Sequence, residues 1–169
     1  MGMAGLIGVG LLVYLALSGI VNKPGIRFNP ADVVNGVKVH ASHEMMMDSG
    51  SNISNNLPAD TGARPEIQVS EQLYDFGEVG ANQVLKHTFV IANLGQVSLV
   101  IVHAYTTCGC TAADFTAASI PPGKVALMTL QFDPGYHDMQ GTTVRRGVMI
   151  ETNDPEHPLQ EIWIQASVK

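Results

Sequence analysis

Residues 99–111 read LVIVHAYTTCGCT, and this stretch decides how the rest of the chain is organised. It is a run of β-branched and aromatic residues that ends in both cysteines of the protein. A short apolar run that is rich in Val and Ile and closed by a turn signal is typical of a strand buried on both faces. Gly109 allows the backbone to turn tightly between the two thiols. We therefore expect a buried strand that ends in a Cys-Gly-Cys turn.

The residues from Glu66 to the C-terminus show a period of two. Short alternations of apolar and polar residues are separated by turn sequences such as NLG, IPPG, FDPG and TNDP. This spacing predicts an antiparallel β-sandwich, and no long amphipathic helix interrupts it. We expect seven strands, at residues 67–70, 74–79, 84–93, 99–107, 125–132, 143–152 and 160–168.

The alternation also predicts the core, because side chains two apart on a strand share one face. Trp163 falls on the opposite face of the last expected strand, where it either covers the edge of the sandwich or contacts a neighbouring protein. The residues expected in the core are Leu85, Phe89, Ile91, Ala126, Met128, Leu130, Phe132, Val148, Ile150, Ile162, Ile164, Ala166 and Val168.

The N-terminus (residues 1–21) predicts a membrane anchor. Residues 3–21 carry no charge, and a helix of that length spans roughly 28 Å, which matches a bilayer core. A cleaved signal peptide is the alternative, but the basic segment that precedes such a peptide is missing. Gly2, Gly5 and Gly8 recur every third residue and favour close packing against partner helices in the bilayer. The other explanation is that Gly is common in membrane helices.

Residues 22–65 are rich in Gly, Pro, Asn and Ser and predict an extended linker between the anchor and a sandwich domain at residues 66–169. Such a segment buries too little apolar surface to stay ordered alone, so we expect it to lie along partner subunits. Phe28 is one expected partner contact. Lys23 and Arg27 follow the anchor, and on the positive-inside rule alone they favour a cytoplasmic domain.

Within this linker, residues 40–47 read HASHEMMM and contain a cluster of imidazole and thioether groups. His40, His43, Met45, Met46 and Met47 are a set of ligands that suits Cu(I). Against a metal site, consecutive methionines on a flexible segment more often pack against a partner protein. We therefore expect no bound cofactor, and we keep both the copper and the partner-contact interpretations of these residues.

Cys108 and Cys110 permit three interpretations. A disulfide across one residue closes a small ring that is comparatively easy to reduce. Two thiolates can hold a soft metal, although nothing else in the chain completes a four-ligand site. In the third interpretation, the two small side chains fill the end of the sandwich.

Charge and motifs exclude several classes of function. The net charge of -6, with Arg145 and Arg146 as the only adjacent basic pair, argues against nucleic acid as a partner. There is no Ser-His-Asp arrangement, no phosphate-cradling glycine loop and no metalloprotease helix. We expect neither an enzyme nor a small-molecule substrate.

A resemblance now connects these features. The segments YDFGEV, HTFVIANLG, TTCGCT, IPPG, LQFDPG and TNDPEHP occur in the order found in a bacterial family. Residues 65–169 resemble the domain of unknown function 1573 family, whose immunoglobulin-like domains are related to the ASPM/Hydin group. The resemblance implies an immunoglobulin-like sandwich, no established enzyme activity and export, which outweighs Lys23 and Arg27 and places the domain outside the cytoplasm.

The expected protein is therefore a single-pass membrane protein with an extracytoplasmic, periplasmic sandwich that binds other proteins. It contacts lipid through residues 3–21 and serves as an accessory subunit of a larger membrane complex, for which an energy-transducing one is a candidate. The first alternative is a periplasmic copper-binding protein that uses the His/Met linker and the two cysteines. The second alternative is a thiol redox protein.

Overall fold

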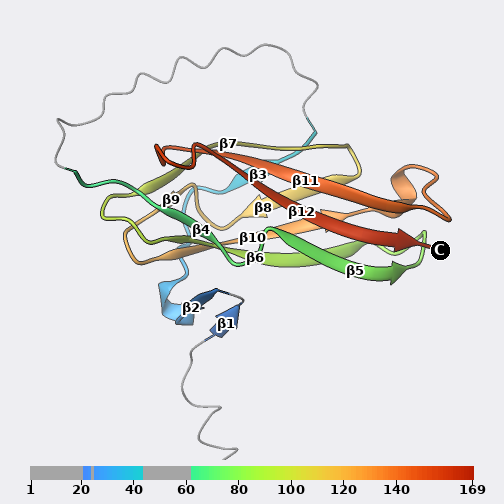
Figure 1. The fold of residues 1–169 in the computed structure, drawn as a ribbon, viewed down its shortest axis with the longest axis horizontal. Coiled ribbons are helices and arrows are strands. Elements are labelled where there is room, and N and C mark those ends of the chain that lie inside the picture. Colours follow the sequence, from blue (N-terminus) through green and yellow to red (C-terminus); the bar gives the residue numbers. More distant parts are fainter. Residues whose placement is uncertain (1–20, 24, 44–61) are drawn as a thin grey trace, which may run out of the picture.

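The computed structural model describes residues 21–23, 25–43 and 62–169, and in these residues the protein is mainly β (Figure 1). Two five-stranded sheets pack face to face. The front sheet has the order β5-β12-β11-β7-β9, with β5 (Leu73–Val79), β7 (Leu99–Thr106), β9 (Ser119–Ile120), β11 (Thr143–Thr152) and β12 (Leu159–Val168). The back sheet has the order β3-β8-β10-β6-β4, with β3 (Val39–Ala41), β4 (Ile67–Val69), β6 (Leu85–Asn93), β8 (Thr111–Phe115) and β10 (Val125–Phe132).

All seven strands predicted from the sequence are present, and their ends agree within one residue. The chain crosses from the back sheet to the front sheet between β4 and β5, so that β5 runs parallel to β12 while the other pairs are antiparallel. The structure adds β8 and β9, which the sequence pattern did not predict. It also adds β3 and a two-stranded hairpin of β1 (Val21–Lys23) and β2 (Ile26–Phe28).

Strand β7 differs from the expectation that it is buried on both faces. Leu99, Ile101 and Ala104 are buried, but Val102 is 38% exposed. The reason is its position in the front sheet, where one face packs on the core and the other faces solvent. A register shift opposite Thr152 moves the alternation by one residue, which is why Val102 and His103 both lie outside the core.

The core lies between the two sheets, and every residue predicted for it from alternation is buried there. Phe89, Phe132 and Ile164 are each 0% exposed. The two strands that flank the Cys-Gly-Cys turn add Ile101 and Ala113 to the same cluster. Each large side chain buried in this way stabilises the fold by about 1.5–3 kcal/mol.

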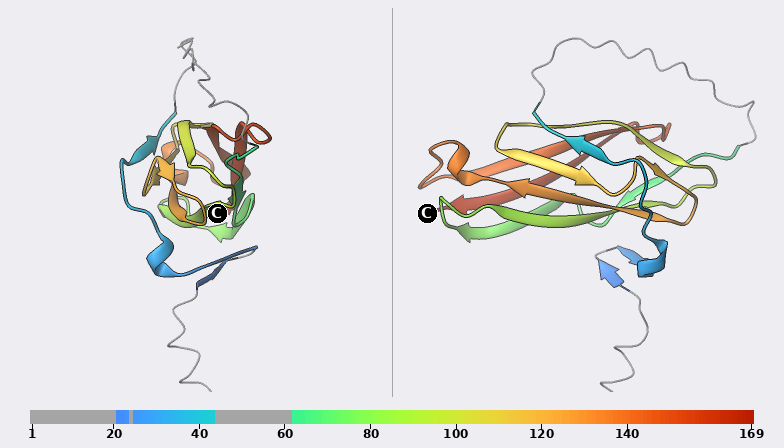
Figure 2. Two further views of the ribbon diagram at one scale, coloured as in Figure 1. Left: turned by 90° about the vertical axis from the view of Figure 1, so that its left-hand side faces the viewer. Right: turned by 180° about the vertical axis from the view of Figure 1, so that it is seen from behind.

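Residues 25–43, which we call the N-terminal strap, fold onto the back sheet (Figure 2, left). Ile26 and Phe28 are buried against Val90, Ala92 and Val125, on the outer side of β6 and β10. Lys124 forms an ion pair with Asp32 at 2.7 Å, beside the short helical turn η2 (Pro30–Asp32). Strand β3 then pairs with the edge strand β8.

The strap corrects the expectation that this part of the linker lies along partner subunits. Phe28, expected as a partner contact, is 9% exposed and packs against the same chain. The physical reason is that residues 89–93 of β6 are buried on both faces, so the apolar outer surface of the back sheet needs a cover. The strap supplies that cover.

Several predictions fall on residues whose structure is not described. These are the anchor at residues 3–21 except for Val21, the small residues Gly2, Gly5 and Gly8, and the cluster of Met45, Met46 and Met47. Among the residues that are described, no helix is long and apolar enough to cross a membrane.

Candidate functional site

At one end of the sandwich, the side chain of Asp154 joins the two sheets. It is 2% exposed. Its Oδ2 atom accepts a hydrogen bond from the amide of Ile67 at 2.9 Å, and its Oδ1 atom accepts one from the amide of Glu156 at 2.9 Å. His157 Nδ1 lies 3.4 Å from Oδ2. The TNDPEHP segment therefore holds the end of β11 against β4 in the opposite sheet.

This arrangement keeps Asp154 ionised. Burial raises the pKa of its carboxyl group, but the hydrogen bonds from the amides of Ile67, Glu156 and His157 and from the His157 side chain outweigh burial and leave the pKa below its usual value. A charged carboxylate is thus stabilised by backbone donors inside the fold.

Asn93 performs a similar structural task in the NLG segment. Its side-chain nitrogen donates to the carbonyls of Val97 and Ile120, both at 2.8 Å, and its oxygen accepts from the amide of Gly95 at 2.9 Å. A Cβ atom on Gly95 would lie 2.3 Å from the carbonyl oxygen of Arg64, so only glycine fits there. The segment fixes the loop between β6 and β7.

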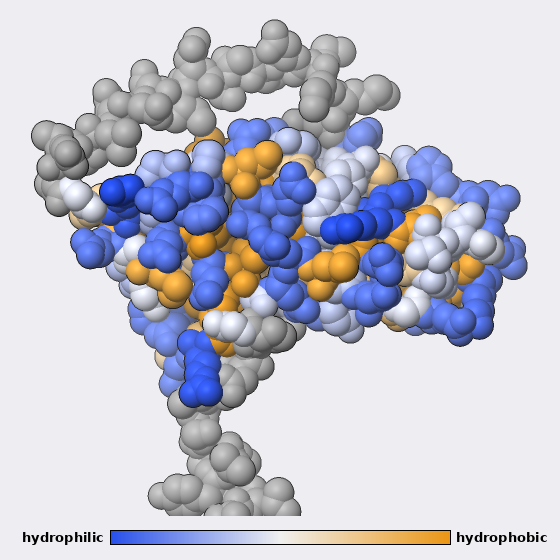
Figure 3. Space-filling view, in the orientation of Figure 1, coloured by the Kyte–Doolittle hydropathy of each residue, from blue (hydrophilic) through white to orange (hydrophobic). Residues whose placement is uncertain are grey.

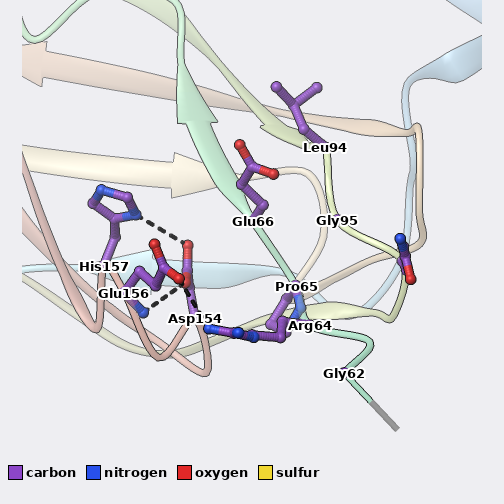
Figure 4. A pocket seen from close by; sticks show the side chains of 10 residues that line it. Gly62, Arg64, Pro65, Glu66, Leu94, Gly95, Asp154, Glu156 and His157 are labelled. Atoms are coloured by element: carbon purple, nitrogen blue, oxygen red, sulfur yellow. Dashed lines mark hydrogen bonds and ion pairs between the residues drawn. The ribbon is translucent and has the colours of Figure 1, made fainter.

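The hollow beside these residues has a volume of about 320 Å³ and is lined by Arg64, Glu66, Glu156 and His157 among others (Figure 4). Arg64 and Glu156 form an exposed ion pair at 2.9 Å. The hollow contains no Ser, Thr or Cys that a base could activate. Its buried polar groups form hydrogen bonds with one another and with the backbone. We therefore interpret the hollow as part of a structural feature, which we call the clasp, in which Asp154 and its hydrogen bonds hold the two sheets together.

At the opposite end, the Cys-Gly-Cys turn connects β7 to β8, and Cys108 and Cys110 are joined by a disulfide. Cys110 is 3% exposed and belongs to the core, whereas Cys108 is only partly buried. The amide of Thr111 donates to the Cys108 carbonyl at 3.2 Å. A Cβ atom on Gly109 would lie 2.9 Å from the hydroxyl oxygen of Tyr136, so the aromatic ring covers this glycine.

The structure distributes the candidate metal ligands over separate contacts. His40 Nδ1 lies 2.8 Å from Asp114 Oδ1, and His43 Nδ1 lies 3.3 Å from the carbonyl oxygen of Thr106. Cys108 and Cys110 use their sulfur atoms in the disulfide, so neither offers a thiolate to a metal in this state. In the described part of the chain, no three His, Cys, Asp or Glu side chains are grouped so that they could hold a metal ion.

The outer side of the front sheet carries Trp163, the outward-facing aromatic predicted from the sequence, which is half-buried. We call this surface the Trp163 face and define it by Leu73, Tyr105, Met149, Leu159 and Trp163, which alternate with core residues on their strands. Met149 is covered by its neighbours and is only 8% exposed. Leu73 is 42% exposed and pairs in register with Trp163, and Leu159 is 46% exposed. Figure 3 shows apolar residues between polar ones over this sheet.

The contacts around Trp163 fix its ring in place. It lies over Gly147, where a Cβ atom would be only 2.8 Å from the ring. The Arg145 guanidinium stands 5.0 Å from the ring centroid, and the indole nitrogen donates to Glu161 Oε2 at 3.1 Å. Trp163 therefore covers its own sheet and presents its remaining surface to solvent. The sequence indicated Trp163 through alternation but carried no signal for Gly147 or Arg145, because the register of β11 against β12 decides which residues flank it.

The architecture defines the class: a mainly β sandwich of two five-stranded sheets, of the immunoglobulin-like kind. The chain belongs to the family described as "Protein of unknown function (DUF1573)", which matches residues 67–168 and so confirms the resemblance drawn from the sequence. No curated protein matches the chain.

One solved structure with a TM-score above 0.5 has a similar fold. The chain is similar to a protein of unknown function from Porphyromonas gingivalis W83, with 25% identity and a TM-score of 0.59, and the match covers 66% of this chain and 51% of that one. The chain thus spans about half the length of that relative. It is also similar to the ASH/PapD-like domain 7 of human CEP192, with 8% identity and a TM-score of 0.45, over 75% of this chain and 97% of that one.

Proposed function

We propose that this protein is a membrane-anchored, extracytoplasmic protein-binding module that serves as an accessory subunit of a larger membrane complex. The observation that carries the proposal is the Trp163 face. It combines a fixed aromatic ring with exposed Leu73 and Leu159 on a rigid sheet. Aromatic residues held rigidly at a surface are typical anchors of protein interfaces.

The charged groups beside Trp163 suit the same role. Arg145 and Glu161 both contact the ring system and remain at the surface, so they form a polar border around an apolar centre. Interfaces commonly have this arrangement, in which the apolar centre supplies affinity and the border supplies specificity.

Two observations support the proposed location. Residues 3–21 form an uncharged segment of bilayer length ahead of the domain. The disulfide between Cys108 and Cys110 is chemistry that persists in oxidising compartments such as the periplasm and is rare in the cytosol. Together they favour an anchor in the membrane with the sandwich outside the cytoplasm.

The proposed role is non-catalytic, because the residues of the family motifs stabilise the fold. Asp154, Asn93 and Gly95 hold loops and sheets together, and Gly147 makes room for the Trp163 ring. The hollow beside Asp154 is lined by no Ser, Thr or Cys that could serve as a nucleophile.

Purification of the full chain from its native membrane tests the proposal. We expect identified integral membrane proteins to stay with the wild-type protein in fixed stoichiometry and to be lost from the Trp163→Ala variant. Val84→Ala is the matched control, because Val84 is 49% exposed and lies outside the Trp163 face. Thermal unfolding of both variants shows whether the fold is kept. Unchanged recovery of the membrane proteins by a folded Trp163→Ala variant contradicts the proposal.

A further inference from the structure

Beyond protein binding, we propose that the Cys108–Cys110 disulfide is a thiol–disulfide exchange site that accepts two electrons from a dithiol. The feature that points to this is the combination of a partly buried Cys108, a fully buried Cys110 and a turn whose backbone is held without the cross-link.

The cross-link contributes little to holding the fold. A disulfide stabilises by restricting the unfolded chain, and the effect grows with the length of the closed loop, which here contains one intervening residue. A structural bridge would be expected to join distant strands. The Cys108–Cys110 bridge joins neighbours within one turn, so a structural role accounts for it poorly.

Hydrogen bonds hold the turn independently of the sulfur atoms. The Cys108 carbonyl accepts from the amide of Thr111 at 3.2 Å, and the hydroxyls of Thr106 and Thr111 lie 3.0 and 3.1 Å from it. The Cys110 carbonyl accepts from the amide of Asp133 at 2.9 Å. Reduction therefore leaves the two Cα atoms near their present separation of 5.3 Å, which is within the range for disulfides, and the bond can form again.

The difference in burial sets the order of the reaction. A thiolate of the incoming dithiol attacks the Sγ atom of Cys108, the less buried of the two cysteines, and forms a mixed disulfide with it. The bond to Cys110 breaks, and the Cys110 sulfur keeps the electron pair and takes up a proton. The second thiol of the dithiol then attacks the first sulfur of the dithiol, which is bound to Cys108 in the mixed disulfide. This step releases Cys108 as a thiolate. The dithiol is oxidised to a disulfide, and the protein is reduced to two thiols.

The strand register assigns Arg146 a place opposite Cys108, from which we infer that it stabilises the released Cys108 thiolate; one of its terminal nitrogens donates to the Arg145 carbonyl at 2.9 Å. The amide of Thr107 donates to the carbonyl of Gly147 at 3.0 Å, and the amide of Gly147 donates to the Thr107 hydroxyl at 2.9 Å. This register makes Cys108 and Arg146 cross-strand neighbours. The Nε atom of Arg146 is buried and has no hydrogen-bond partner among the residues that the structure describes. A thiolate is an acceptor for such a donor, and a nearby cation favours the thiolate form.

Other titratable groups lie near the turn, among them His137, whose ring contacts that of Tyr136 at 4.8 Å between centroids. His43 follows β3, Asp133 follows β10, and Tyr136 ends the short helical turn η3 (Pro134–Tyr136) and covers Gly109. Tyr136 is 59% exposed, so it offers an aromatic contact beside the disulfide to an approaching protein. Arg146 is the one permanently cationic group of this set.

The first test treats the folded full-length protein in detergent with dithiothreitol and counts the alkylated cysteines by mass spectrometry. We expect both cysteines to become reactive without loss of the folded state, and oxidised glutathione to restore the disulfide. In single variants, Cys108 of Cys110→Ser should form the glutathione adduct at least about tenfold faster than Cys110 of Cys108→Ser. A disulfide that resists dithiothreitol until urea unfolds the protein, or equal rates in the two variants, overturns the proposal.

The second test separates the charge of Arg146 from its structural role. In the Cys110→Ser background, the pH at which alkylation of Cys108 reaches half of its maximal rate should rise in Arg146→Met and stay unchanged in Arg146→Lys. Identical pH profiles in all three proteins overturn the assignment of Arg146. Loss of exchange leaves the protein-binding test at Trp163 unaffected, because that residue lies on the outer face of the front sheet.

Discussion

The carboxylate of Asp154 and the backbone amide of Ile67 join the two sheets through a hydrogen bond of 2.9 Å. Asp154 follows β11 in the front sheet, and Ile67 begins β4 in the back sheet. The carboxylate is buried, so this bond connects the sheets where water does not compete for either group. The same carboxylate also orders its own loop through the amide of Glu156.

We predict that Asp154→Asn lowers the free energy of unfolding by about 1–3 kcal/mol, because an amide group cannot accept from both backbone donors and leaves one of them unsatisfied. Urea unfolding of the full chain measures the change. Glu156→Gln is the control, since its ion pair with Arg64 is exposed and should change stability by less than about 1 kcal/mol. Equal effects of the two substitutions would show that the clasp does not depend on the buried carboxylate.

The stability of the protein should also depend on the ionisation of Asp154. Its pKa is lower in the folded protein than the value of about 3.9 for an unfolded chain, so the ionised form favours folding. The contribution is fully present above about pH 4 and is lost as the pH falls through the folded pKa. The difference in unfolding free energy between wild type and Asp154→Asn should therefore shrink as the pH falls from about 4 into strongly acidic solution. A difference that stays constant over that range refutes the prediction.

For the N-terminal strap, we predict that Phe28→Ala lowers the free energy of unfolding by about 1.5–3 kcal/mol, the value of a buried Phe side chain. Hydrogen exchange should also become faster at the amide of Val34, which donates to the Val125 carbonyl at 2.8 Å in the intact strap. Val37→Ala is the matched control within the strap, because Val37 is 80% exposed. A strap that exchanges freely in the isolated wild-type protein would contradict this packing.

The sequence predicted the seven main strands and their core, because apolar and polar residues alternate along any strand that has one face buried and one exposed. This pattern can be read from neighbouring residues alone. It did not predict the strap, because Ile26 and Phe28 show no extended periodicity and are buried only through contact with strands far along the chain. Strand β8 was missed for a related reason. Its small residues Ala112 and Ala113 have low strand propensity, so the sequence signal is weak. The strand forms because it pairs with β10.

Of the candidate functional surfaces, too, the sequence predicts some features, and only the structure shows the others. Alternation alone indicated that Trp163 faces outward. That Gly147 lies beneath the ring follows from the register of β11 and β12, which the sequence does not encode locally. The partner of Asp154 is likewise remote in the chain, so the sequence indicates TNDPEHP as a family motif but does not indicate that it holds the sheets together.

Photo-crosslinking in native membranes tests the central claim most directly. A photoreactive amino acid replaces Leu159 on the Trp163 face of the full-length protein or, as the control, Lys86 on the back sheet. The account predicts an adduct with one membrane protein from position 159, the loss of this adduct when Trp163→Ala is added, and no such adduct from position 86. The same adduct from both positions, or an adduct from position 159 that persists without Trp163, would contradict the claim that this face binds the partner.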